Sequence, residues 1–370
     1  MHKRILVKVG TNLISDDKGI RKNFLKSFVK QAVSLYKKGM EIIIVSSGAI
    51  GTGKKRLGIT KHSMSLPEKQ AVAAVGQIVL MQEYKQLFRE AGIPVAQVLL
   101  DHDDVRHKDK NINARNTLSK LLEWRVIPII NENDTVATDE IKFGDNDELA
   151  GIVSGLVNVR FAVILTCVDG VYNKNPDKNK DAKIIDYIKN IQTVIKKLEL
   201  KGKTGCGRGG MLSKLEAARK FSYLGIPLVI ANGSRKNALC KAVERNGDDN
   251  GIGTFIESRR TKIEGRKKWI LTSLKTKGFV IVDDGAAEFL YQKGKSLLAV
   301  GVKDLSGDFG FGDAVEVVNK KSGKIGKGII NYSSDDLRKI KGKNNREIKK
   351  IAGAGFYEEV IHRDNMFIYK

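Results

Sequence analysis

The 370-residue sequence has few of the features that mark secreted, fibrous or membrane proteins. Its three cysteines, Cys167, Cys206 and Cys240, lack the spacing of a disulfide framework or a zinc site. Five prolines and 41% hydrophobic residues exclude a disordered or collagen-like chain. The longest apolar runs, such as Ile42–Val45 and Phe161–Leu165, are too short to span a bilayer. The start of the sequence shows a strand pattern and no signal-peptide core, so we expect a cytoplasmic protein with reduced thiols and no membrane partner.

Acidic residues are also scarce, with 42 against 66 basic residues and a net charge of +24. This excess is spread evenly: residues 1–263 hold 45 basic and 28 acidic residues, and residues 264–370 hold 21 and 14. Both segments therefore carry about 0.065 net charges per residue. Nucleic-acid binders usually concentrate basic residues on one face or arm. The even distribution favours a lysine-rich background over a dedicated nucleic-acid protein, which we keep as the alternative.

The first 260 residues alternate between strand and helix patterns, which predicts an α/β three-layer sandwich with a mostly parallel central sheet. The expected strands are 4–9, 41–45, 95–99, 126–130, 161–165 and 228–230, and the expected helices are 24–35, 68–91, 115–124, 147–156 and 212–224. From Gly278 onward the pattern changes to short strands punctuated by glycine, expected at 279–282, 296–300, 314–318 and 327–330. This pattern predicts a small β-rich domain. We expect an α/β domain over 1–258, a linker over 259–275, the β-rich domain over 276–354 and a C-terminal tail over 355–370.

Four polar segments follow predicted strands of the first domain. They are Gly10-Thr11-Asn12, Ser46-Ser47-Gly48-Ala49-Ile50-Gly51, Asn131-Glu132-Asn133-Asp134-Thr135 and Thr166-Cys167-Val168-Asp169-Gly170. Each alone is ordinary turn chemistry. Ligands of open α/β sheets bind beyond the carboxyl ends of the strands, so the four together predict a site at that edge.

Two glycine-rich segments suit anions. Gly48–Lys55 has the spacing of a phosphate-binding P-loop, but Lys55 stands where a Ser or Thr must hold magnesium, which disfavours an actual P-loop. The segment Gly205–Lys214 precedes a predicted helix with Lys214 one turn inside it, and this favours phosphate binding over a merely flexible loop. Asp145 and Asp147 add acidic residues beyond what capping of the helix at 147–156 requires.

Together these residues resemble the glutamate 5-kinases, a group within the amino acid kinase family. The resemblance rests on Lys8-x-Gly10-Thr11, Ser46-Ser47-Gly48-Ala49-Ile50, Asn131-Glu132-Asn133-Asp134-x-Val136-Ala137, Phe143-Gly144-Asp145-Asn146-Asp147 and Gly209-Gly210-Met211-x-Ser213-Lys214-Leu215. It is colinear over about the first 255 residues. The segment from Gly278 to Ile340 resembles the PUA domain that bacterial members carry at the C-terminus.

The resemblance implies ATP-dependent phosphorylation of the side-chain carboxylate of L-glutamate to L-glutamyl 5-phosphate, the first step of proline biosynthesis. It implies that Lys8 and Lys214 approach the transferred phosphoryl group, with Asp147 orienting both. The residues that it implies for glutamate binding are Ser47, Gly48, Asp134, Asp145 and Asn146. Those that it implies for ATP are Lys8, Gly10, Thr166, Cys167, Arg208, Gly209, Gly210, Met211, Leu212, Ser213 and Lys214. Mg2+ is then held mainly by the ATP phosphates, with no protein side chain as a metal ligand.

Two residues depart from the family pattern. Cys167 stands where many relatives have an acidic residue, and Arg208 stands where threonine is frequent. Both concern the nucleotide site, and we expect Cys167 to be an inert buried thiol.

The alternatives to a glutamate 5-kinase are an amino acid kinase acting on aspartate, acetylglutamate or UMP, and an RNA-binding PUA protein with a kinase-like scaffold. The family also implies a homo-oligomer and proline as a feedback inhibitor.

Overall fold

A computed structural model describes the chain in two compact units, residues 1–261 and 262–370. The described residues are 3–16, 19–61, 63–101, 107–136, 145–176, 179–200, 210–245, 247, 251–259, 265–321, 323–352 and 357–369. Within these ranges, no helix combines the length and the apolar character needed to cross a membrane.

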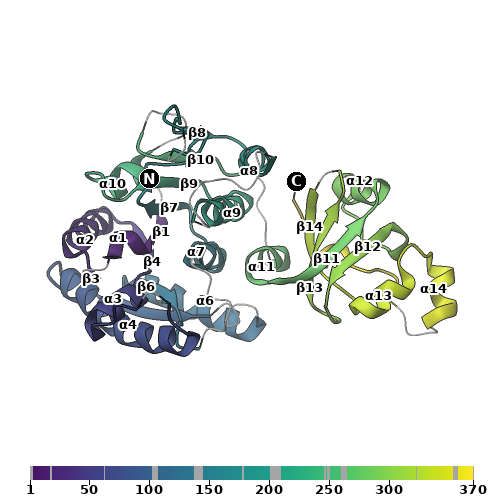
Figure 1. Cartoon of the computed structure of the whole chain (residues 1–370), viewed down its shortest axis with the longest axis horizontal. Helices are drawn as coiled ribbons and strands as arrows, with labels where there is room; N and C mark the ends of the chain where they lie inside the picture. Colours follow the sequence, from purple (N-terminus) through teal and green to yellow (C-terminus); the bar gives the residue numbers. More distant parts are fainter. Residues whose placement is uncertain are drawn as a thin grey trace. The chain divides into compact units, whose positions relative to one another are not determined.

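The described part of the first unit is built on one eight-stranded sheet in the order β5-β6-β4-β1-β7-β9-β10-β8 (Figure 1). The strands are β1 (Arg4–Val9), β4 (Glu41–Val45), β5 (Val95–Leu100), β6 (Ile127–Glu132), β7 (Phe161–Thr166), β8 (Tyr187–Ile188), β9 (Leu228–Asn232) and β10 (Thr254–Ile256). All pairs are parallel except β9 with β10, which is antiparallel. A separate hairpin joins β2 (Ser15–Asp16) to β3 (Gly19–Ile20). The mostly parallel sheet expected from the sequence is confirmed.

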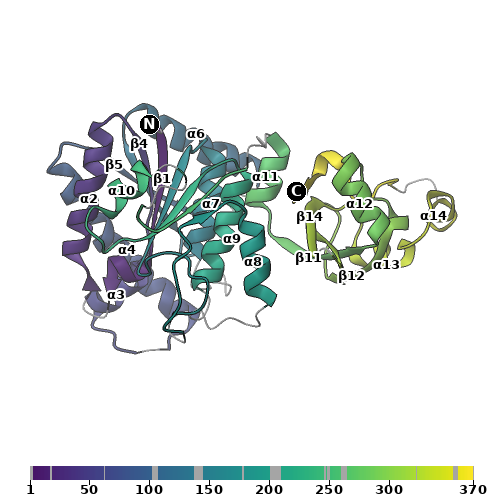
Figure 2. The ribbon, with the colours of Figure 1, turned by 90° about the horizontal axis from the view of Figure 1, so that it is seen from above.

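Helices cover both faces of this sheet, so the unit has three layers (Figure 2). Alternation along β1 divides its side chains: Ile5 and Val7 belong to one hydrophobic core and Leu6 belongs to the other. The first core includes side chains of α1 (Thr11–Ile14), α2 (Lys22–Lys37), α4 (Leu66–Arg89) and α10 (Ala238–Glu244). The second includes side chains of α6 (Lys108–Glu123), α7 (Asp145–Leu156), α8 (Ile191–Leu200) and α9 (Gly210–Tyr223). The predicted sandwich is therefore confirmed.

The glycine-rich segment after β4 forms a helix, α3 (Ala49–Leu57), and packs on α4 at very short range. A Cβ atom added to Gly53 would lie 1.9 Å from the carbonyl oxygen of Val72, and one added to Gly76 would lie 1.9 Å from that of Ala49. The two helices thus meet backbone to backbone, which only glycine permits. Gly48 precedes α3 with φ 92°. The positive φ of Gly48 and the close contact of Gly53 explain the two glycines that gave the segment its P-loop spacing.

The second unit contains a five-stranded sheet in the order β12-β11-β13-β14-β15, as far as its residues are described. The strands are β11 (Thr276–Val282), β12 (Val302–Gly307), β13 (Ala314–Asn319), β14 (Gly323–Ile329) and β15 (Met366–Ile368). The helices are α11 (Gly265–Ser273), α12 (Asp284–Lys293), α13 (Ser334–Ile340) and α14 (Asn345–Ala352), with 3-10 turns η1 (Ala299–Gly301) and η3 (Arg363–Asn365). The β-rich architecture predicted for this region is confirmed.

Three details of this unit differ from the sequence-based expectation. The strand expected at 296–300 is wrong: Leu297 makes a single bridge to Ile361, and η1 follows before β12 begins. The range 259–275, expected as a linker, contains α11, whose Ile270 and Leu271 are buried. The range 355–370, expected as a tail, contains β15, which pairs with β14 and buries Met366. In the last two cases, buried apolar side chains fix segments whose flanks are strongly charged.

Candidate active site

Two lysines from different elements converge on one carboxylate. Lys8 lies on β1 and faces the same side of the sheet as Leu6, the side where the core contains α7 and α9 side chains. Its Nζ is 2.7 Å from Oδ1 of Asp147, in the first turn of α7, and Nζ of Lys214, in α9, is 3.1 Å from Oδ2. The hydroxyl of Ser213 donates to the same Oδ2 at 3.2 Å. The structure thus brings together the three residues predicted to act on the phosphoryl group.

Burial strengthens the electrostatic interactions among the charges of Lys8, Lys214 and Asp147. Asp147 is fully buried and Lys8 is 4% exposed. Burial and the nearby Lys214 charge together lower the pKa of Lys8 below its usual 10.5, although the Asp147 carboxylate opposes them. Burial alone would raise the pKa of Asp147, but the ammonium groups of Lys8 and Lys214 outweigh it and hold that pKa below 3.8. One anion between two cations leaves a net positive centre, which suits an anionic ligand.

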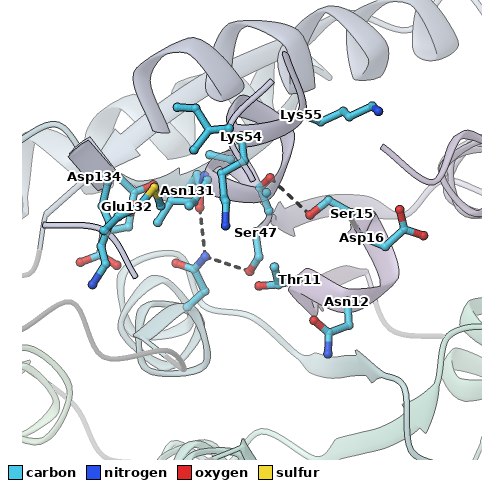
Figure 3. A pocket seen from close by; sticks show the side chains of 18 of the residues that line it. Thr11, Asn12, Ser15, Asp16, Ser47, Lys54, Lys55, Asn131, Glu132 and Asp134 are labelled. Carbon is cyan, nitrogen blue, oxygen red and sulfur yellow. Dashed lines mark hydrogen bonds between the residues drawn. The ribbon is translucent and has the colours of Figure 1, made fainter. Parts of the chain in front are cut away.

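A cavity of about 830 Å3 adjoins this centre (Figure 3). Its wall includes Lys8 and four residues predicted from the sequence, Ser47, Gly48, Asp134 and Asn146. Ser47 and Gly48 follow β4, Asp134 follows β6, and Asn146 lies in the first turn of α7. The carboxyl ends of these parallel strands therefore bring the polar segments together, as the topology rule predicts.

Hydrogen bonds tie the wall of this cavity together. Nδ2 of Asn146 donates to the carbonyl oxygen of Ser46 at 2.8 Å, to Oγ of Ser47 at 2.9 Å and to Oδ1 of Asn131 at 3.0 Å. The bonds to Ser47 and Asn131 are drawn as dashed lines in Figure 3. Nδ2 of Asn131 in turn donates to Oε1 of Gln77 at 2.8 Å. The loop after β4 is thus fixed to both β6 and α7.

Of the residues predicted for the nucleotide, those that the structure describes lie near the ends of β1 and β7 and at the start of α9. The backbone N–H of Gly10 donates to the carbonyl of Leu165 at 2.9 Å, which brings Gly10 beside Thr166, the last residue of β7. Cys167 is exposed, so the expectation of a buried thiol is wrong, because β7 ends one residue earlier. Partial desolvation nonetheless raises the pKa of its thiol, against the opposing charges of Arg21 and Lys214.

The other predicted residues can be placed in part. Gly210 begins α9, Met211 is half-buried and Leu212 is 55% exposed. Arg208 and Gly209 lie outside the described residues. Asp145 begins α7, but its side chain lies outside the described part of the structure.

Several cavity-lining residues were not chosen from the sequence. Ser15 and Asp16 come from β2, Lys54 and Lys55 from the last turn of α3, and Lys69 from α4. Lys54 and Lys55 lie in the glycine-rich segment with P-loop spacing but are not among the residues predicted for the site. No motif marks Ser15, Asp16 or Lys69, and only the positions of β2 and α4 bring them to the wall. Gln77 was also missed. The available signal was a glutamine on the otherwise apolar face of α4 that carries Ala73, Leu80 and Tyr84.

The described residues contain no cluster of three or more His, Cys, Asp or Glu side chains that could hold a metal ion. Both carboxylate oxygens of Asp147 face ammonium groups. Each oxygen of this carboxylate therefore has a cationic partner from the protein itself.

Comparison with known proteins identifies relatives of this chain. The amino acid kinase family matches residues 3–232, and the PUA domain family matches residues 278–352. A glutamate 5-kinase from Syntrophus aciditrophicus is 40% identical over 368 residues, which cover 100% of this chain and 94% of the relative. Glutamate 5-kinases from Caldanaerobacter subterraneus subsp. tengcongensis and Dictyoglomus thermophilum are each 42% identical, over 99% of this chain and 97% of their own. The UMP kinase of Ureaplasma parvum aligns structurally over 70% of this chain and 100% of its own, with a TM-score of 0.46 and 16% identity. From the sequence matches, the chain belongs to the amino acid kinase family, in the group whose members are named glutamate 5-kinase.

Proposed function

We propose that this protein transfers the γ-phosphoryl group of ATP to the side-chain carboxylate of L-glutamate, forming L-glutamyl 5-phosphate in proline biosynthesis. The names of its full-length relatives support the substrate. One structural observation carries the chemistry: two lysine ammonium groups, one of the buried Lys8 and one of the half-buried Lys214, share the single carboxylate of Asp147 beside a cavity.

This arrangement suits phosphoryl transfer to a carboxylate. The acceptor oxygen is already nucleophilic, so catalysis depends on alignment and charge neutralisation and requires no general base. Lys8 and Lys214 neutralise charge on the transferred group, and Asp147 holds both ammonium groups in fixed positions. Preorganised cations in a site shielded from water need no rearrangement as the reaction proceeds.

The cavity wall suits an amino acid with two carboxylates. The Ser47 hydroxyl and the backbone N–H groups after Gly48, at the N-terminus of α3, are donors for a carboxylate. The Asp134 carboxylate is a partner for an ammonium group. Asn146 holds Ser47 in place, and Asp145 is assigned to the same pocket by resemblance.

The nucleotide is assigned to Gly10, Thr166, Cys167 and the segment from Arg208 to Lys214. Mg2+ would be held mainly through the ATP phosphates, where it neutralises charge on the transferred group. Both oxygens of Asp147 face lysines, which supports this arrangement. The proposal extends to a homo-oligomer in the cytoplasm and to inhibition by proline, tested by sedimentation, cell fractionation and addition of proline to the assay.

The test is ATP turnover by the purified full chain with glutamate, aspartate, acetylglutamate or UMP, each with hydroxylamine to trap any acyl phosphate. We expect a hydroxamate with glutamate and turnover at least about a hundredfold above that with the other acceptors, which corresponds to about 3 kcal/mol. Preferred turnover of another acceptor would reassign the substrate. No turnover with any acceptor, together with salt-sensitive binding of RNA, would favour the RNA-binding alternative.

A further inference from the structure

We infer that Gln77 is a positioning residue for the proposed glutamate site, although it is not among the residues that line the cavity. It acts through Asn131 and Asn146 on the hydroxyl of Ser47. Gln77 lies in the middle of α4 and is 9% exposed, next to Gly76, where α4 touches α3. This inference rests on the proposed function for the identity of the ligand, but the hydrogen-bond chain itself does not.

The hydrogen bonds that link Gln77 to Ser47 run in a single donor-to-acceptor direction, and one backbone atom sets that direction. The carbonyl oxygen of Ser46 can only accept a hydrogen bond, so Asn146 must turn its NH2 group toward it. The same NH2 group lies 3.0 Å from Asn131, which must therefore present its oxygen. The NH2 group of Asn131 then faces α4, 2.8 Å from Gln77, which must present Oε1. A flipped amide at any position would bring two donors or two acceptors together.

The other end of the chain is the functional one. Oγ of Ser47 accepts from Asn146 at 2.9 Å, and this orients the hydroxyl hydrogen away from Asn146. A hydroxyl oriented in this way is a donor, and a donor is what a substrate carboxylate needs. Gln77 therefore reinforces, from one helix away, the polarity that the carbonyl oxygen of Ser46 sets in the cavity wall.

The residue type also carries a cost for folding. Nε2 of Gln77 is buried and finds no hydrogen-bond partner among the described residues. A buried unpaired donor destabilises a folded protein, and an apolar side chain at this position would avoid it. A glutamine here is explained by its acceptor oxygen and not by packing.

The test compares Gln77→Leu, which loses the acceptor, with Gln77→Glu, which keeps an acceptor oxygen. Gln31→Leu is the matched control. Gln31 is a glutamine of α2, 8% exposed, whose Oε1 accepts from the N–H of Leu239 at 2.9 Å, and it does not line the cavity. For Gln77→Leu we expect KM for glutamate to rise about tenfold, with KM for ATP within twofold of wild type. The reason is that the one buried hydrogen bond that is lost supports the glutamate side of the site and not the ATP side. Gln77→Glu should stay within about threefold of wild type, and Gln31→Leu should leave both KM values unchanged.

A second readout needs no catalysis. Hydrogen–deuterium exchange of the first turn of α7, at residues 145–149, should be faster in Gln77→Leu than in wild type and unchanged in Gln31→Leu. If Gln77→Leu does not fold, Gln77→Met, which also lacks the amide, replaces it in both experiments. Equal rises in both KM values, or exchange at α7 that matches Gln31→Leu, would overturn the role of Gln77. A wild-type protein that does not phosphorylate glutamate would refute the proposed function, and the exchange experiment would still test the chain.

Discussion

Replacing Asp147 with asparagine removes the negative charge that lies between the ammonium groups of the buried Lys8 and the half-buried Lys214. In wild type these groups lie 2.7 and 3.1 Å from the carboxylate, and the side chains of Lys8 and Lys214 are only 5% and 12% exposed. Breaking a buried ion pair by removing one partner costs about 3–5 kcal/mol, because the remaining charge stays buried. We therefore expect the free energy of unfolding of Asp147→Asn to fall by about 3–5 kcal/mol at pH 7.

The loss should depend on pH. Burial already lowers the pKa of Lys8 below 10.5, and removing Asp147 removes the charge that opposes this shift. Between the lowered pKa and 10.5, the unfolded chain binds more protons than the folded chain, so the stability of the variant rises with pH. Its deficit relative to wild type should therefore be smaller at pH 9 than at pH 7. ATP, which brings negative charge to the same place, should stabilise the variant more than wild type.

Urea denaturation followed by circular dichroism at pH 7 and pH 9 measures these effects. The control is Asp169→Asn, which breaks a pair with Arg235 at 2.8 Å whose arginine side chain is 63% exposed. An exposed pair of this kind is worth at most about 1 kcal/mol. The reasoning is refuted if Asp147→Asn costs no more than Asp169→Asn, or if its deficit is the same at both pH values.

The other predictions concern activity and domain autonomy. Lys8→Ala and Lys214→Ala should each lower kcat at least about a hundredfold in a folded protein, and near-normal turnover would remove them from the phosphoryl site. The alkaline limb of the kcat profile should fall below pH 10.5, because Lys8 loses its proton at a lowered pKa; a limb unmoved by Lys8→Arg would contradict this. Asp134→Ala should mainly raise KM for glutamate, and an unchanged KM would exclude Asp134 from the substrate site. A fragment ending near residue 262, where the two units divide, should be a folded and active kinase, whereas an insoluble fragment would refute its autonomy.

Much of the fold could be predicted because its strongest signals are local. The range Glu41–Val45 was predicted as a strand with the bounds that the structure has, because the four β-branched residues Ile42–Val45 lie between Gly39 and Ser46. The residues 49–57 were not predicted as a helix, because glycine is unfavourable in helix interiors. At Gly53 that cost is offset by close packing on α4, a tertiary contact that no local pattern encodes.

The residues of the site also divide into those that local motifs predict and those that depend on tertiary contacts. The motif residues Lys8, Asp147 and Lys214 were predicted, and the structure shows their contacts. Gln77 and Lys69 were not, because each belongs to α4 and reaches the site region only through the crossing of α3 and α4. Predicting that Gln77 and Lys69 lie near the site would have required knowledge of the distance between α3 and α4. That distance is set by two glycines more than twenty residues apart in the sequence.

The contact of Gly53 with Gly76 has a consequence for redesign of the pocket. Because each glycine faces backbone and not a side chain, no smaller residue on the partner helix can make room for a methyl group. A change at either position must push α3 away from α4, and with it the wall that begins at Gly48. Altered acceptor specificity is therefore better sought at the side chains around the opening, such as Asp134 and Lys69, than in the helix pair. In a redesign of this pocket, α3 and α4 should therefore be kept or replaced together as one packed helix pair.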